Sequence, residues 1–148
     1  MSITRRDLFF VPGSPAPQGS KRHVGGGRMI ESSKYVGPWR ATIAGVAGQC
    51  IEYGPRVGPV AVALDFVLPR PKSEPKTTRP HTRRPDVDKL ARAVLDALTG
   101  IYFADDSQVD SLAATKRTAE PGEQPGVHIC VEGKTEELRT VVVGGRAA

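Results

Sequence analysis

The sequence contains few aromatic residues, few cysteines and few histidines. Phenylalanine, tryptophan and tyrosine account for 5% of its 148 residues, and there are 2 cysteines and 3 histidines. Cys50 and Cys130 have no paired spacing, which argues against a disulfide framework or a zinc knuckle and predicts two small buried hydrophobic residues. None of His23, His81 and His128 has the neighbours of a catalytic triad, and His128 is expected on the exposed side of its strand.

Long hydrophobic runs are also absent. No segment reaches the length of a membrane span, and the N-terminal segment MSITRRDLFFVPGS has too short an apolar core for a signal peptide. The glycines at 25–27 lack the Lys and the Ser or Thr of a phosphate-binding loop. We therefore expect a cytoplasmic protein that has neither a membrane partner nor a small-molecule cofactor.

Hydrophobic residues nevertheless make up 39% of the chain, which is enough for one folded domain of this length. Apolar periodicity and the positions of Gly and Pro predict strands and helices in alternation. The predicted strands lie at 7–12, 60–68, within 101–118 and from 126, and the predicted helices at about 37–51 and 87–99.

This order predicts a compact single domain of mixed α/β (α+β) class, in which a small mixed sheet of about four strands packs against helices. We place the domain at 1–133. The Pro- and Gly-rich segments at about 13–30 and 69–85 are expected to be basic loops that are mobile without a ligand. The tail at 134–148 fits either an edge strand or a disordered end.

The net charge of +5 is unevenly distributed. Basic residues concentrate in the two predicted loops and at the start of the following helix, as expected for a surface that binds a polyanion such as nucleic acid. The alternative is a solvated loop with no ligand. The residues that we expect to contact DNA are Lys21, Arg22, Arg70, Lys72, Lys76, Arg79, Arg83, Arg84 and Lys89.

Four aspartates surround the second predicted helix. Asp86 and Asp88 stand at its start, and Asp105 and Asp106 follow shortly after its end. Each can be explained structurally, because Asp at a helix N-cap or in a first turn contributes about 0.5–2 kcal/mol. Taken together, however, a tight turn could bring the second pair back toward the first, and ionised carboxylates repel each other unless a cation lies among them.

A divalent cation such as Mg²⁺ would suit such a cluster, since it prefers oxygen ligands and often shares its shell with phosphate oxygens. Bound there, it would activate water and stabilise charge on a phosphodiester. Nearby Lys and Arg would hold the phosphate backbone. Composition and spacing thus favour a metal-dependent enzyme of nucleic acid backbones.

The segment RPDVDKLARAVLDALTGIYFADDSQV, at 84–109, resembles the signature of the RusA family of Holliday-junction resolvases. In that signature an Asp-x-Asp-Asn helix start, a basic residue, LDAL-G and a later DDSQV follow in this order. The resemblance extends more weakly to the first strand, to GSPAPQGSKR and to GVHICVEG.

The resemblance implies a RusA-like fold and a homodimer that uses Mg²⁺, or Mn²⁺ as a substitute, to cut four-way DNA junctions by paired symmetric nicks. Such enzymes act in DNA recombination and repair and are often encoded by phages or prophages. By the same resemblance Asp86, Asp88 and Asp106 are the catalytic metal ligands, Asp105 is a candidate fourth, and Arg92 stands at a functional lysine position.

Two positions depart from the signature. Lys89 replaces the Asn that follows the second Asp, and Arg92 replaces the lysine. Arginine can clamp a phosphate but cannot donate a proton, so an acid role at this position is in question. Lys89 would either compensate for this, neutralise the carboxylates or contact DNA.

Two other functions remain open from the sequence. One is a non-catalytic basic DNA-binding protein whose aspartates are only helix caps. The other is a metal-dependent nuclease that acts on RNA or on another branched DNA. Single-strand binding by base stacking is less favoured, because the aromatic candidates are few: Tyr35, Trp39, Tyr53 and Tyr102.

Overall fold

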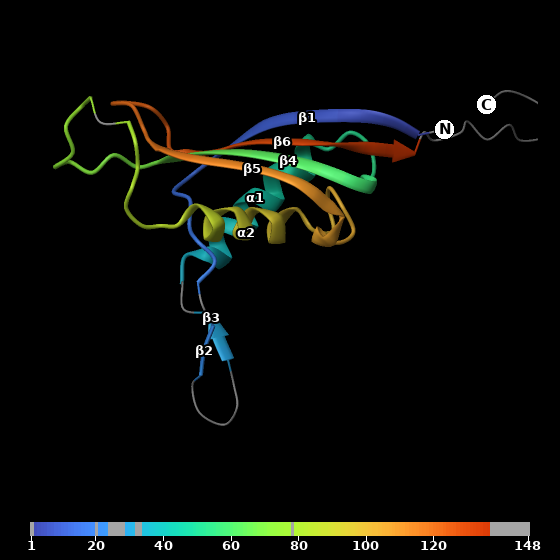
Figure 1. Cartoon of the computed structure of the whole chain (residues 1–148), viewed down its shortest axis with the longest axis horizontal. Helices are drawn as coiled ribbons and strands as arrows, with labels where there is room; N and C mark the ends of the chain where they lie inside the picture. Colours follow the sequence, from blue (N-terminus) through green and yellow to red (C-terminus); the bar gives the residue numbers. More distant parts are fainter. Residues whose placement is uncertain (1, 20, 24–28, 32–33, 78, 137–148) are drawn as a thin grey trace, which may run out of the picture.

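The computed structural model describes residues 2–19, 21–23, 29–31, 34–77 and 79–136. It has two layers, a four-stranded sheet and a pair of helices that lie against one face of it (Figure 1). The predicted single α+β domain with about four strands is confirmed. The elements in chain order are β1 (Ser2–Pro12), β2 (Lys21–His23), β3 (Met29–Glu31), α1 (Val36–Cys50), β4 (Val57–Leu68), α2 (Val87–Leu98), the 3-10 turn η1 (Asp106–Gln108), β5 (Val109–Thr118) and β6 (Gly126–Glu136).

The sheet is mixed, with the strand order β1-β6-β4-β5. β6 is antiparallel to both β1 and β4, whereas β4 and β5 are parallel. Parallel neighbours need a crossover connection, and α2 lies in it. The crossover returns the chain from the end of α2 through η1 to the beginning of β5, where Val109 lies opposite Val60.

The apolar stripe of α2 explains how this helix is fixed. Leu90, Val94 and Leu98 are fully buried in the core between the sheet and the helices. The opposite side carries Asp88, Arg92, Asp96 and Thr99, which are all exposed. The predicted division of this helix into a core side and a solvent side is therefore correct, and it determines which polar residues face outward.

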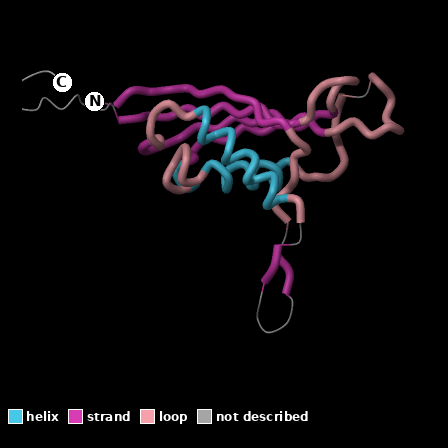
Figure 2. The backbone as a smooth tube through the Cα atoms, turned by 180° about the vertical axis from the view of Figure 1, so that it is seen from behind, coloured by secondary structure: helices cyan, strands magenta, loops and turns pink. Residues whose placement is uncertain are grey.

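The other face of the sheet carries no helix formed by the described residues. Figure 2, seen from behind, shows both helices on the same side of the four strands. Side chains alternate along a strand, so residues on every second position of β1 point to the uncovered face. Leu8 is 73% exposed there, and His128 of β6 is exposed as predicted.

The structure corrects several boundaries. β1 begins at Ser2 rather than at residue 7, because backbone pairing with β6 continues through the polar half of the strand. β6 continues to Glu136, beyond the predicted limit at residue 133, and its Thr135 is buried. The rest of the tail lies outside the described residues.

Two further expectations were wrong. The segment predicted as one long loop contains the two-stranded antiparallel pair β2 and β3, which projects from the body on the helix side (Figure 1). Cys50 is exposed at the last position of α1 rather than buried, and Cys130 is only partly buried. Finally, no helix in the described part of the chain is long and apolar enough to cross a membrane.

Candidate functional site

The site begins where the 69–85 segment leads into α2. Lys116 of β5 donates hydrogen bonds from Nζ to the carbonyl oxygens of Arg83 at 2.7 Å and Pro85 at 2.9 Å. This contact fixes the chain just before the helix. Asp86 then occupies the N-cap position, and its carbonyl accepts from the Leu90 N–H at 3.1 Å.

The side chain of Asp86 does not cap the helix. It makes no cap hydrogen bond, and the nearest cation is Nζ of Lys89, 3.9 Å from Oδ2. Both side chains are about half exposed, so this contact is weak. The helix-cap interpretation therefore accounts for the backbone of Asp86 and not for its carboxylate.

Asp88 lies in the first turn of α2, on its solvent side, and faces a cavity of about 700 Å³. Within the described residues its carboxylate has neither a hydrogen bond nor an ion pair. The cavity brings together residues from four parts of the chain. They are Gln18, Gly19, Asp88, Lys89, Ala91, Arg92, Leu95, Asp106 and Leu112.

One wall of this cavity comes from the segment after β1. The Gln18 N–H donates to the Lys89 carbonyl at 3.0 Å, and Oε1 of Gln18 accepts from Arg40 at 2.8 Å. Arg40 in turn lies 3.8 Å from Asp96 of α2. These contacts could not be predicted from the sequence, because each joins residues that are far apart along the chain.

The opposite wall is the DDSQ turn, where the helix-cap interpretation is correct for Asp105. Its Oδ1 accepts from the Ser107 N–H at 2.8 Å, and this hydrogen bond lowers the pKa of Asp105. Oε1 of Gln108 accepts from the N–H groups of Ala104 and Asp105, at 2.9 and 3.2 Å. Together these bonds form a capping box around η1.

Gln108 also ties this turn to the sheet. Its Nε2 donates to the carbonyl oxygens of Arg56 and Gly58, both at 3.0 Å, just before and within the beginning of β4. The turn therefore has a fixed place beside β4, and Asp106 is held at the edge of the α2 cavity. Gln108 belongs to the motif recognised in the sequence, but its anchoring role could only be seen once β4 and η1 were placed together.

The four aspartates do not all converge. Asp88 and Asp106 line the same cavity, whereas Asp86 and Asp105 are not among its lining residues. Asp105 lines a neighbouring cavity with Asp106 and Asp96. In the described part of the chain no three His, Cys, Asp or Glu side chains are grouped closely enough to hold a metal.

Two carboxylates on one cavity still fit Mg²⁺, because this ion often binds through one or two carboxylates and completes its shell with waters and phosphate oxygens. The donor set of Asp88 and Asp106 meets that requirement. The described residues do not form a closed cage of protein ligands.

Two basic residues complete the α2 cavity. Arg92 is exposed on the same helix side as Asp88, and its guanidinium has no hydrogen bond or ion pair within the described ranges. Lys89 stands between them in sequence and reaches toward Asp86. Carboxylates and cations therefore share one open cavity, an arrangement suited to a phosphate and a divalent cation together.

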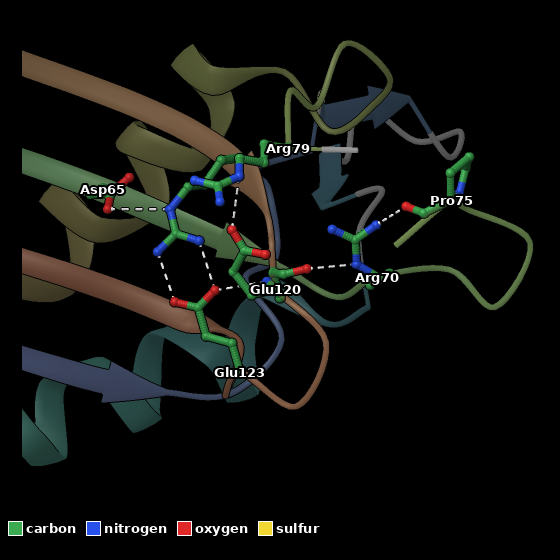
Figure 3. A network of polar contacts seen from close by, with 8 residues as sticks. Asp65, Arg70, Pro75, Arg79, Glu120 and Glu123 are labelled. Atoms are coloured by element: carbon green, nitrogen blue, oxygen red, sulfur yellow. Dashed lines mark hydrogen bonds and ion pairs between the residues drawn. The ribbon is translucent and has the colours of Figure 1, made fainter. Parts of the chain in front are cut away.

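The basic loop at 69–85 divides into anchored and unanchored cations. Nε of Arg70 donates to the Ala119 carbonyl at 2.8 Å, and its Nη1 donates to the Pro75 carbonyl (Figure 3). Arg79 lies 3.0 Å from Glu120, and Arg83 lies 2.6 Å from Glu74. These arginines hold the loop to itself and to the turn between β5 and β6.

The remaining predicted DNA contacts of the loop are different. Lys72, Lys76 and Arg84 have no hydrogen bond or ion pair with any described residue. For Lys21 and Arg22 the structure describes only the backbone of β2. DNA binding by the whole set stays a prediction, and the unanchored cations are the ones whose charge is not already used.

The charged network in Figure 3 is centred on Arg117 of β5. Its two terminal nitrogens each donate to Glu123 at 2.7 Å, and its Nε lies 3.9 Å from Asp65. The Arg117 hydrogen bonds lower the pKa of Glu123 to about 2. This network ties the turn between β5 and β6 to β5 and β4.

A buried charge cluster supports the DDSQ turn from inside. Arg56 is buried, and its Nη2 lies 3.0 Å from Oδ1 of Asp7, while the hydroxyl of Tyr102 donates to Oδ2 of Asp7 at 2.9 Å. Burial, together with Asp7, raises the pKa of Tyr102. The guanidinium nitrogens of Arg56 have no hydrogen bond with a described residue, so the contact with Asp7 is an ion pair without hydrogen-bond geometry.

Comparisons with known proteins agree with this arrangement. The family described as Endodeoxyribonuclease RusA matches residues 12–132, which include both walls of the cavity and all four aspartates. The chain is also 32% identical over 139 residues to the protein named "Uncharacterized protein YqaN" of Bacillus subtilis (strain 168), covering 83% of this chain and 93% of that one. The chain therefore belongs to the RusA endodeoxyribonuclease family.

Proposed function

We propose that this protein is a Mg²⁺-dependent endonuclease that selects branched DNA and resolves four-way junctions by paired symmetric nicks. The observation that carries the proposal is the α2 cavity, where Asp88 and Asp106 share one open space with Arg92. Mn²⁺ is the expected substitute for Mg²⁺, since both are hard cations that prefer oxygen ligands. The role that follows is in DNA recombination and repair, in keeping with a phage or prophage gene.

Asp88 and Asp106 would hold the cation. When bound, Mg²⁺ supplies positive charge that stabilises the phosphodiester in the transition state and makes water more acidic. Asp86 is the nearest further carboxylate in sequence, and its side chain makes no cap hydrogen bond. It would join the cation ligands when bound DNA brings the start of α2 closer to the cation. Asp105 is already used as the η1 cap, so we assign it a positioning role.

Arg92 would bind the phosphate that is cut. Its planar guanidinium can donate two parallel hydrogen bonds to phosphate oxygens, and it keeps its charge at every accessible pH. It cannot give a proton to the leaving oxygen. Lys89, which lines the same cavity, is the residue there that can carry and release a proton, although its ammonium now neutralises Asp86.

The unanchored cations of the basic loop would hold neighbouring phosphates. Each phosphate contact releases counterions, so binding should weaken steeply with salt. Replacing Lys72 by Gln should make the slope of log K against log salt concentration shallower by about 1, which corresponds to the loss of one phosphate contact. Replacing Arg70 should instead loosen the loop, because its guanidinium is bonded to the Ala119 and Pro75 carbonyls.

Two nicks on one junction require two active sites, and we propose that two copies pair through the sheet face that lacks helices. Leu8 is 73% exposed on this face, beside a hollow of about 550 Å³ lined by Phe10, Ala63 and Cys130 among others. Wild-type protein should be a dimer by light scattering, and Leu8→Glu should be a monomer. Leu112→Glu, on the helix side, is the matched control and should stay dimeric. A monomeric wild type would contradict this part of the proposal.

A second candidate function, a non-catalytic DNA-binding protein, is favoured by one observation. In the described residues no three carboxylate, His or Cys side chains form a metal group, and Asp105 serves as a cap. This alternative predicts junction or duplex binding with a steep salt dependence and no effect of metal. The proposed endonuclease predicts cleavage that starts only when metal is added.

The experiment that separates these functions is cleavage of labelled four-way DNA junctions, flaps, forks and linear duplexes, with and without Mg²⁺. Paired nicks on the junction, absent on the duplex and absent without metal, are expected. Preferred cleavage of a competing RNA junction would indicate a metal-dependent nuclease with the same site but with RNA as its substrate. Failure to nick any branched substrate would reject the enzyme.

A further inference from the structure

A second cavity lies on the other side of the segment that follows β1. It has a volume of about 680 Å³ and is enclosed by residues 12–17, by the beginning of α1 with the residue before it, and by Arg84 and Pro85. None of the roles proposed so far uses it.

The walls of this cavity are flat and largely apolar. Tyr35 and Trp39 contribute aromatic rings, and the segment at 12–17 contributes three prolines. Gly13 is required for this shape, because a Cβ there would lie 2.8 Å from Cζ3 of Trp39. The chain therefore passes directly over the indole ring. Tyr35 is 66% exposed, so its ring is accessible to a ligand in this cavity.

The mouth of the cavity is basic. Arg84 lines it and forms no hydrogen bond or ion pair with any described residue. Nζ of Lys34 lies 5.1 Å from the centre of the Tyr35 ring. An apolar flat space with unpaired positive charge at its entrance suits a ligand with an aromatic body and an anionic group, which describes a nucleotide.

This cavity and the α2 cavity are lined by neighbouring stretches of the chain, although they share no lining residue. The segment at 12–17 continues directly into Gln18 and Gly19, and Pro85 is followed by Asp86 and Asp88. The hydrogen bond from Gln18 N–H to the Lys89 carbonyl holds the two walls together. A strand whose phosphate lies in the α2 cavity would therefore place an adjacent nucleotide at the second one.

We infer that this second cavity binds one unpaired nucleobase of the DNA strand, stacked on Tyr35 with its phosphate near Arg84. The inference rests on the proposed function and adds a recognition element to it. A base in a duplex is stacked on both faces, so a base that lies on Tyr35 has left the helix. The cavity would favour branch points or distorted sites where that cost is low.

Trp39 provides a direct test, because it is the only tryptophan in the chain. We would titrate the protein, in EDTA, with a five-nucleotide single-stranded DNA and with the same DNA carrying an abasic central position. The intact DNA should change the Trp39 fluorescence, and the abasic DNA should bind about 10-fold more weakly, since stacking contributes that order of affinity.

Substitutions give the second arm of the test. Tyr35→Ala should weaken binding of the intact DNA about 10-fold and leave binding of the abasic DNA unchanged. Tyr53→Ala is the matched control, because Tyr53 is also exposed but lies against Arg5, away from this cavity. Arg84→Gln should weaken both DNAs equally, since it binds phosphate. If Tyr35→Ala does not fold, Tyr35→Leu keeps the apolar volume and removes the ring.

Equal binding of intact and abasic DNA, no fluorescence change with intact DNA, or equal behaviour of Tyr35→Ala and Tyr53→Ala would each overturn the inference. These results are distinguishable from failure of the proposed function, because EDTA prevents metal-dependent cleavage and the readout is binding alone. A protein that cuts no junction can still discriminate the two DNAs, and an active nuclease can fail to do so.

Discussion

Two charged regions of this molecule have similar residue types and opposite organisation. At the turn between β5 and β6, Arg117 and Glu123 share two hydrogen bonds of 2.7 Å, and Arg79 lies 3.0 Å from Glu120. In the α2 cavity, Asp88 and Arg92 face the same space and have no partner among the described residues. The first region is neutralised by its own side chains, and the second is open to a ligand.

The two regions therefore separate charges that stabilise the fold from charges that are available for chemistry. A paired guanidinium and carboxylate have already satisfied each other, so replacing one should alter stability. Charges of both signs that face an open cavity without pairing are suited to a ligand that carries both, such as a metal ion with a phosphate. Substitutions of the two kinds of charge should therefore have different effects on stability and on cleavage.

The ion pair between the buried Arg56 and the partly buried Asp7 is the extreme case of a charge that stabilises the fold. Asp7→Asn would leave the Arg56 guanidinium buried without a counterion, so the free energy of unfolding should fall by about 3–5 kcal/mol. Urea denaturation measures this. Glu132→Gln, which breaks the exposed ion pair between β6 and Arg6, the neighbour of Asp7 on β1, is the control and should change little. Equal midpoints for the two variants would contradict the prediction.

Arg92 tests the open side of the comparison. Arg92→Gln should lower the rate of junction cleavage about 10²–10³-fold, as expected for loss of one group that stabilises transition-state charge, and leave the melting temperature unchanged. Arg92→Lys should keep more activity than Arg92→Gln and less than wild type, because the charge remains and the two parallel hydrogen bonds do not. Arg5→Gln, on the other face of β1 where Arg5 lies over the Tyr53 ring, controls for net charge. Cleavage by Arg92→Gln at the wild-type rate would remove this residue from the site.

Gln108 connects the two sides, because it is a structural residue that positions Asp106. Gln108→Ala removes four hydrogen bonds at the DDSQ turn and should lower the free energy of unfolding by about 1–3 kcal/mol. It should also reduce junction cleavage, because Asp106 is no longer held in place. Gln124→Ala is the matched control, since that side chain bonds only to the adjacent Pro125 carbonyl among described residues. A destabilised variant with full activity would show that the turn need not be fixed for catalysis.

The smallest effect concerns Glu123 and pH. Its pKa is lowered to about 2 in the folded protein, from an ordinary value of 4.5. Its contribution to stability is therefore complete above pH 4.5 and is lost as the pH falls toward 2. Glu123→Gln should lower the melting temperature at pH 7 by a few degrees, and the difference from wild type should shrink between pH 4.5 and 2.5. A difference that stays constant with pH would contradict the role assigned to the ionised carboxylate.

The sequence predicted those parts of the molecule that depend on local pattern. The apolar stripe from Leu90 to Leu98 placed α2 to within one residue at its end, and β-branched residues between two prolines placed β4. The start of β1 was missed because its polar half is held by pairing with β6, which no local pattern reports. The pair β2 and β3 was also missed. Its strands are held by pairing with each other, and the Gly and Pro residues around them predict a loop.

The site was predictable in composition and less so in arrangement. The motif identified Asp88 and Asp106, which the structure places on one cavity. It did not separate Asp105, whose carboxylate is used by the Ser107 N–H, because helix caps and metal ligands are the same residue type. Gln18 and Arg40 were invisible in the sequence, since their roles depend on a loop that returns to α2 from the other end of the chain.

The most direct test of the central claim is cleavage of a synthetic four-way junction, with and without Mg²⁺, by wild type, Asp88→Asn and Asp96→Asn. Both substitutions remove one exposed carboxylate from the same helix, but only Asp88 lines the proposed catalytic cavity. We predict metal-dependent paired nicks by wild type and Asp96→Asn, and none by Asp88→Asn, whose melting temperature should be unchanged or higher because repulsion with Asp106 is relieved. Nicking by Asp88→Asn at the wild-type rate, or its clear destabilisation, would contradict the account.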